Sequence, residues 1–202
     1  MTTSIEAAIR ARRSIRRYRP EPVPLALLRE VLEAAGWAPS AHNRQPWRFA
    51  VLGPAARARL ADAMGARLTV DRSADGDPPE AVAADVARSR ARITEAPAVI
   101  LAGFSLADMD RYPDARRAAA ERELALQGTA AALQNLLLAA FGRGLGAAWM
   151  CAPLFCPDTV RAALDLPADW EPQALVTLGY PANAGRPAAR APIDSRILWL
   201  LD

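Results

Sequence analysis

Residues 116–146 read RRAAAERELALQGTAAALQNLLLAAFGRGLG and contain the longest helical pattern in this chain of 202 residues. Its second half, Leu124 to Gly142, carries no charged residue and is apolar on nearly every side. A helix of this kind is buried, either at the centre of a domain or against a second subunit. The polar residues Gln127, Thr129 and Gln134 favour such a core helix over a membrane span.

Segments of strand length lie on both sides of this helix. Ala98 to Phe104 is a continuous apolar run, which is typical of a strand in the middle of a sheet. Three further segments have strand character: Arg48–Leu52, Ala147–Met150 and Gln173–Tyr180. Helices alternate with these four short strands, and this order predicts an α+β fold.

The remaining chain predicts five shorter helices and one loop. Thr3 and Glu6 resemble the capping box of a first helix, and Pro24 opens a second one that ends near Gly36. The other three are expected at Pro54–Met64 (with Gly65 as a stop), Glu80–Thr94 and Pro157–Leu164. Arg67–Pro79 has no periodicity and predicts a mobile surface loop. The apolar end Ile197–Leu201 needs burial, for which a second chain is one candidate.

Composition limits the possible functions. With 52% apolar and 23% charged residues, the chain predicts a single soluble domain over residues 1–202. It has no lysine, which excludes a PLP Schiff base and a Walker-type phosphate loop. One histidine (His42) and two cysteines (Cys151 and Cys156) cannot supply a standard zinc site, so we expect no metal. The cysteine usage and the lack of a signal-peptide pattern predict a cytoplasmic protein.

The net charge is +3, and six arginines lie between Arg10 and Arg19. Nucleic-acid binding is one interpretation of this cluster. Elsewhere acidic and basic residues are mixed, and the sequence has no recognisable DNA or RNA motif. A compact anion such as a phosphate is therefore the favoured ligand.

Three separated segments predict one shared ligand site. The first, RRSIRRY at residues 12–18, offers guanidinium groups and a hydroxyl to a phosphate. The second, APSAHNRQPWRF at residues 38–49, predicts a stiff loop with exposed hydrogen-bonding groups, suited to a planar heterocycle with polar edges. The third, GLGAAWMC at residues 144–151, contains glycines that permit close backbone approach. The side chains of Trp149 and Met150 themselves are expected in the core.

In combination, R-R-S-x-R, A-P-S-x-x-N-x-Q-P-W and G-L-G-x-x-W, in this order, resemble the FMN-dependent nitroreductase family. The resemblance spans residues 12–192. It implies a three-layer sandwich with a central, mostly antiparallel sheet flanked by helices, a homodimer, and a domain-swapped C-terminal tail. Residues 154–181 are most similar to the reductase domain of deazaflavin-coenzyme biosynthesis.

The resemblance also implies roles for individual residues. Arg12, Arg13 and Ser14 would hold the FMN phosphate and ribityl chain. Arg16 would lie near the pyrimidine edge of the flavin, where a cation stabilises negative charge on the reduced ring. Arg190 matches a late arginine that closes on the phosphate, and Arg186 competes for this role.

The other site residues are assigned to the flavin ring. Four would come from the second subunit and cover the ring: Pro39, Ser40, Ala41 and Asn43. The backbone of three more would run along the ring, with an amide near its reactive nitrogen: Trp149, Met150 and Cys151. A further polar contact from the middle of the chain, common in the family, has no match here.

The implied activity is transfer of hydride from NAD(P)H through FMN to a small planar acceptor, such as a nitroaromatic or a quinone, by a ping-pong mechanism. No side chain is assigned as a catalytic acid or base. One alternative is an FMN-dependent reductase of a deazaflavin-coenzyme precursor. Another is a non-catalytic flavin-binding or nucleic-acid-binding protein. No membrane or nucleic-acid partner is expected for the enzyme.

Overall fold

The computed structural model describes residues 4–187 and 189–201, and its described strands form a four-stranded sheet in the order β1-β2-β4-β3. The strands are β1 (Trp47–Val51), β2 (Ala98–Ser105), β3 (Gly146–Met150) and β4 (Trp170–Gly179). Every neighbouring pair is antiparallel. The predicted α+β class and antiparallel sheet are confirmed, with strand boundaries within three residues of those predicted.

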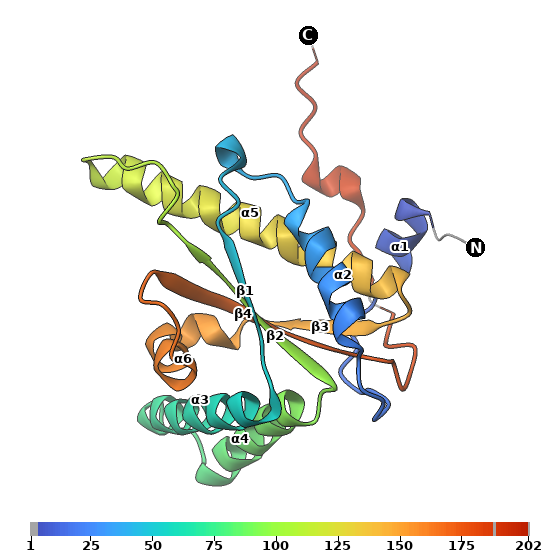
Figure 1. Ribbon diagram of the computed structural model, residues 1–202, viewed down its shortest axis with the longest axis vertical. Helices are drawn as coiled ribbons and strands as arrows, with labels where there is room; N and C mark the ends of the chain where they lie inside the picture. The colour runs from blue at the N-terminus through green and yellow to red at the C-terminus, as the bar shows by residue number, and fades with distance from the viewer. Residues whose placement is uncertain (1–3, 188, 202) are drawn as a thin grey trace.

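Helices cover both faces of the sheet and make the three layers of the expected sandwich (Figure 1). One layer holds α2 (Leu25–Gly36) and α5 (Ala115–Gly142), with the short α1 (Ile5–Ala11) beside α5. The other layer holds α3 (Pro54–Ala74), α4 (Pro79–Thr94) and α6 (Pro157–Leu164). Three single turns of 3₁₀ helix complete the described elements: η1 (Ala41–Asn43), η2 (Ala152–Phe155) and η3 (Ile193–Arg196).

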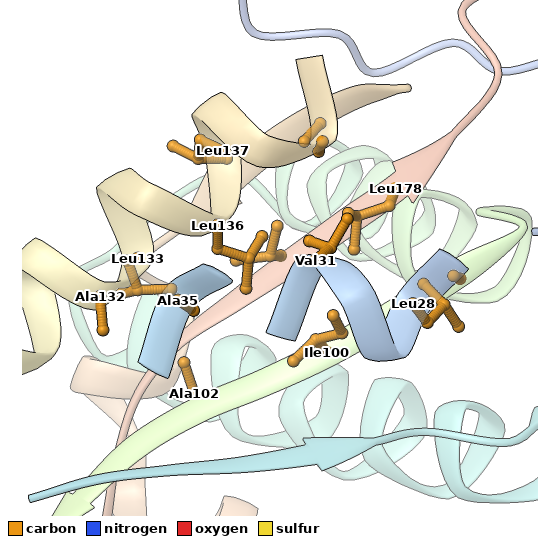
Figure 2. Close-up of a cluster of buried hydrophobic side chains, with 14 of the residues drawn as sticks. Leu28, Val31, Ala35, Ile100, Ala102, Ala132, Leu133, Leu136, Leu137 and Leu178 are labelled. Carbon is orange, nitrogen blue, oxygen red and sulfur yellow. The ribbon is translucent and has the colours of Figure 1, made fainter. Parts of the chain in front are cut away.

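The first core lies between α2, α5 and the upper face of the sheet. Figure 2 shows Val31 of α2 and Leu136 of α5 directed toward each other and toward Ile100 of β2. All three side chains have no exposed surface. By length and composition α5 could also cross a membrane. Its buried residues instead pack against α2 and the sheet, as predicted for a central core helix.

The second core lies on the opposite face, where α3, α4 and α6 pack. Leu60 and Ile93 meet Val99 and Leu101, which alternate along β2 with the residues that face α5. Because β2 is buried on both faces, all eight of its residues are buried. This double burial explains why the sequence of β2 is continuously apolar.

The prediction for residues 65–79 is wrong. Helix α3 does not stop at Gly65, and most of the predicted loop Arg67–Pro79 is helical, since α3 continues to Ala74. A Cβ atom on Gly65 would lie 3.0 Å from Val86 Cγ1, so this glycine allows α4 to approach closely. The polar side chains of the segment are held by ion pairs, including Arg67 with Asp71 at 2.8 Å.

The two ends of the chain also differ in detail from expectation. Ser4 caps α1, its hydroxyl accepting a hydrogen bond from the Ala7 amide at 3.2 Å, whereas Thr3 lies outside the described residues. Near the other end the structure has η3, which the sequence did not predict. The described part of the tail beyond it, Ile197–Leu201, is exposed and extends away from the sheet (Figure 1).

Candidate functional site

The segment Arg12–Tyr18 is fixed along the edge of the sheet next to β3. The Ile15 amide donates to the Ala147 carbonyl oxygen at 2.9 Å, and the Ile15 side chain is buried. Gly146 makes this approach possible, because a Cβ atom there would lie 2.7 Å from Ile15 Cβ. The glycine of the G-L-G motif therefore serves close backbone packing, as predicted.

Tyr18 anchors the far end of the same segment. Its hydroxyl oxygen lies 2.6 Å from the Ile15 carbonyl oxygen and 2.7 Å from the Thr177 hydroxyl oxygen. Burial raises the pKa of Tyr18 to about 12, so the hydroxyl stays protonated and can donate. With Ile15 and Tyr18 turned toward the fold, the polar and charged side chains between them are left on the outside.

A hollow of about 570 Å³ lies on that outer side. Ser14, Asn183 and Gly185 contribute to its wall, and no carboxylate from residues 4–187 or 189–201 does. We call it the cationic hollow, because six arginines line it: Arg12, Arg13, Arg16, Arg17, Arg186 and Arg190. Gly185 has a φ of +75°, and a Cβ there would lie 2.8 Å from Arg13 Cβ. This turn brings the late arginines to the early ones.

The charges of the cationic hollow are not neutralised within the chain. None of its six guanidinium groups pairs with a carboxylate of the residues that the structure describes. Burial, with the charges of Arg190 and Arg13, lowers the pKa of Arg12. Like charges held together in this way are unfavourable until an anion binds between them. The arrangement suits a phosphate, whose oxygens accept hydrogen bonds from several guanidinium groups.

The third predicted segment lies on the neighbouring strand. The side chains of Trp149 and Met150 pack against the two cores, as expected, and Cys151 is exposed. The Ala147 carbonyl faces the outer edge of β3, so the alternation of a strand directs the backbone N–H of Trp149 to the same edge. The indole Nε1 of Trp149 is buried and has no acceptor among the described residues. Of these two donors, only the backbone N–H lies at the edge of β3 that faces the segment Arg12–Tyr18, because the indole nitrogen is enclosed.

The loop after α2 has a strained backbone. Three residues without the freedom of glycine have a left-handed φ: His42 (48°), Asn43 (54°) and Gln45 (49°). Such strain persists where surrounding contacts hold it, and it is concentrated at functional sites. Here the Ser40 hydroxyl accepts from the Gln45 amide at 3.0 Å, and Gly128 of α5 leaves room for Ser40.

The structure brings only part of the predicted site together in one chain. Five predicted residues line the cationic hollow: Arg12, Arg13, Ser14, Arg16 and Arg190. Arg186 lines it as well, so both late arginines remain candidates. Pro39, Ser40, Ala41 and Asn43 do not line it, and η1 lies over the middle of α5, away from α1 (Figure 1). Three lining residues were not predicted as site residues from the sequence: Arg17, Asn183 and Gly185. Arg17 nevertheless belongs to the same arginine cluster.

Comparison with known proteins gives a consistent result. The model of the nitroreductase family matches residues 9–180. An NADH dehydrogenase of Thermus thermophilus is 37% identical, covering 93% of this chain and 92% of its own. A 5,6-dimethylbenzimidazole synthase of Rhodospirillum rubrum is 32% identical over 88% and 82% of the two chains. A solved structure described as a nitroreductase in complex with FMN, from Desulfovibrio desulfuricans, has a TM-score of 0.72 and 32% identity over 96% and 95%.

Proposed function

Because this chain belongs to the nitroreductase family, we propose that it is an FMN-dependent oxidoreductase that oxidises NADH or NADPH and reduces a small planar acceptor, such as a nitroaromatic or a quinone. The observation that carries the proposal is the cationic hollow, lined by no carboxylate of the described residues, beside the edge of β3 on which Ser14 and Ile15 lie. A phosphate-bearing cofactor with a planar ring would use both features.

The residues of the hollow fit FMN. Arg12, Arg13 and one or both late arginines would bind the phosphate, and Ser14 would donate to the phosphate or the ribityl chain. Arg16 would face the pyrimidine edge and favour negative charge there. The outward backbone N–H of Trp149 would donate to the ring. Bound FMN supplies two-electron chemistry: it accepts hydride from a nicotinamide and gives two electrons to an acceptor.

The protein then has to bind FMN and the substrates, orient them and exclude water. We assign no side chain as an acid or base. Oxidation of one NAD(P)H with one proton from solvent balances the reduction of one quinone to its quinol. If nicotinamide and acceptor occupy the same face of the flavin in turn, the oxidised nicotinamide leaves before the acceptor enters. This order is the ping-pong mechanism.

A homodimer would explain why a single chain leaves apolar surface exposed and keeps the loop Pro39–Asn43 away from the cationic hollow. Only 44% of the residues in the most apolar stretch of α5 are buried within the chain. The end of the C-terminal tail, Ile197–Leu201, is exposed. A second copy packed on α5 would cover both, with each C-terminal tail wrapping its partner. It would also bring residues Pro39–Asn43 to the other subunit's flavin. We propose this dimer of single-domain subunits, acting in the cytoplasm without membrane or nucleic acid.

A specialised biosynthetic reductase is the second candidate. The relative from Rhodospirillum rubrum is named for a biosynthetic reaction, so similarity at this level is compatible with a dedicated substrate. For this chain the resemblance of residues 154–181 suggests a deazaflavin-coenzyme precursor as that substrate. In this case neither nicotinamide need act as the reductant.

The visible absorption spectrum of the purified protein tests the proposal. Oxidised flavin is expected to show bands near ~370 and ~450 nm, and NADH or NADPH added under nitrogen should bleach the second. A bound flavin that neither nicotinamide reduces would favour the biosynthetic candidate. A colourless protein that stays colourless after incubation with FMN would contradict the proposed function.

A further inference from the structure

A second hollow, of about 730 Å³, lies under the segment 106–112 that joins β2 to α5. Its other walls come from the first turns of α5, the start of α6 and the start of β4. A volume of this size suits a small organic ligand. We call it the acidic hollow, because four carboxylates line it against two guanidinium groups: Asp110, Glu121, Asp169 and Glu171 against Arg111 and Arg161.

Glu121 differs from the other three carboxylates. It is only 8% exposed, and no hydrogen bond or ion pair to its carboxylate comes from the residues that the structure describes. The others all have partners: Asp110 pairs with Arg44, Asp169 accepts from the Ser105 hydroxyl, and Glu171 pairs with Arg122 at 2.7 Å. Of the two cations, Arg161 pairs with Asp158, and Arg111 is exposed on the covering segment.

The enclosed side-chain atoms without a partner in the described part of the chain do not include the Glu121 oxygens, so these oxygens face the hollow. A largely buried carboxylate that no described protein group pairs with can accept a hydrogen bond from a ligand that enters the hollow. Among the described residues, no three potential ligands are arranged to hold a metal ion. Much of the remaining wall is apolar, with Leu106, Met109 and Pro157 in it. The matching ligand has an apolar body and one cationic N–H donor.

The covering segment is joined to the strained loop after α2. Arg48 binds Asp108 at 3.0 Å, and Arg44 pairs with Asp110. In the proposed dimer this loop covers the flavin ring of the other subunit. The acidic hollow is then part of the same connected surface as the place where the acceptor binds.

We propose that Glu121 is a specificity-determining residue, and that the acidic hollow binds aromatic molecules carrying a protonated amine. The ring packs against Leu106 and Met109, and the ammonium group donates to the Glu121 carboxylate. The statement that these amines act as electron acceptors rests on the proposed function. Their binding to the acidic hollow is independent of that function.

Two pairs of probes separate these statements. Benzylamine and benzyl alcohol have similar shapes and no reducible group, so calorimetry on the flavin-loaded protein measures binding alone. Para-nitrobenzylamine and para-nitrobenzyl alcohol are the reducible counterparts, compared by kcat/KM with NADH or NADPH. We expect the wild type to prefer the amine by about tenfold or more in both measurements, as for a hydrogen bond between charged groups.

The variant Glu121→Gln keeps the shape and removes the charge, so it should lose the amine preference and leave the alcohols unchanged. Glu123→Gln, at an exposed position of the same helix, is the control and should keep the preference.

No preference for the amine in the wild type, or a preference that survives Glu121→Gln, would overturn the inference. So would a weaker dimer in Glu121→Gln, because the partner of Glu121 would then lie in the second subunit. Binding of benzylamine through Glu121 by a protein that oxidises NADH or NADPH with neither a nitro compound nor a quinone would support the hollow and contradict the proposed function.

Discussion

The core between α2 and α5 is built from apolar side chains that fill each other's gaps, whereas the cationic hollow gathers six arginines without a carboxylate. Val31 and Leu136 of the core have no exposed surface, and their burial stabilises the fold. Burial and the neighbouring charges of Arg190 and Arg13 lower the pKa of Arg12. Like charges gathered without a counter-ion oppose folding, and an anion bound between them would remove that cost, so binding is the best explanation of the hollow.

The largest effect is expected in the core. Leu136→Ala leaves a cavity among fully buried neighbours and should lower the free energy of unfolding by about 2–5 kcal/mol. Urea denaturation of the flavin-free protein measures this loss. Leu25→Ala, at a side chain 78% exposed on α2, is the control and should change stability by less than about 0.5 kcal/mol. Equal losses in the two variants would show that the α2–α5 contact is not the stabilising one.

The second effect concerns Tyr18, which joins the arginine segment to β4. Burial raises its pKa to about 12 in the folded protein, against about 10 in an unfolded chain. Between these pH values the unfolded chain has lost the proton and the folded one keeps it. The free energy of unfolding should therefore fall as pH rises from about 10 to about 12, by roughly 1.4 kcal/mol per unit at most. Below about pH 10 the stabilisation from this group is fully present and does not vary with pH.

Denaturation at a series of alkaline pH values measures this slope. Tyr18→Phe removes the titrating group and should flatten the slope, whereas Tyr112→Phe, at a more exposed tyrosine, should keep it. An unchanged slope in Tyr18→Phe would mean that other groups, not this anchor of the arginine segment, cause the alkaline loss of stability.

The elements predicted correctly are those whose burial is visible in local sequence. β2 is buried at every position because other elements cover both of its faces, and this leaves a strong apolar signal in any short window. The second half of α5 carries no charge, and its buried residues pack against α2 and the sheet. Residues 65–74 have no such signal. Their helix depends on contacts distant in sequence: Gly65 against Val86, and Arg72 with Asp85 at 2.8 Å. Local propensity cannot report contacts of this kind.

The site residues likewise fall into those that could be predicted from the local sequence and those that could not. The early arginines could be grouped from the sequence because they are adjacent, and the structure does place them in one hollow. The choice between Arg186 and Arg190 could not be made, because the turn at Gly185 brings both to that hollow. The role of the Pro39–Asn43 loop still depends on a second chain. Glu121 carried no signal, since its distinction is the lack of a partner in three dimensions.

The smallest effect on stability, and the one of opposite sign, is expected at Arg12. Arg12→Gln removes a charge that Arg190 and Arg13 disfavour, so the flavin-free protein should keep its stability or gain a few tenths of a kcal/mol. The same change removes a charged donor to the phosphate, so FMN affinity should fall about tenfold to a hundredfold. Denaturation with and without FMN measures both effects, since the cofactor stabilises the folded state by an amount that grows with the logarithm of its affinity. Arg29→Gln, on the exposed face of α2, should leave FMN binding unchanged. If Arg12→Gln destabilised the flavin-free protein and bound FMN normally, Arg12 would be a structural residue. The cationic hollow would then stabilise the fold as the core does, and the proposed contrast between the two regions would be wrong.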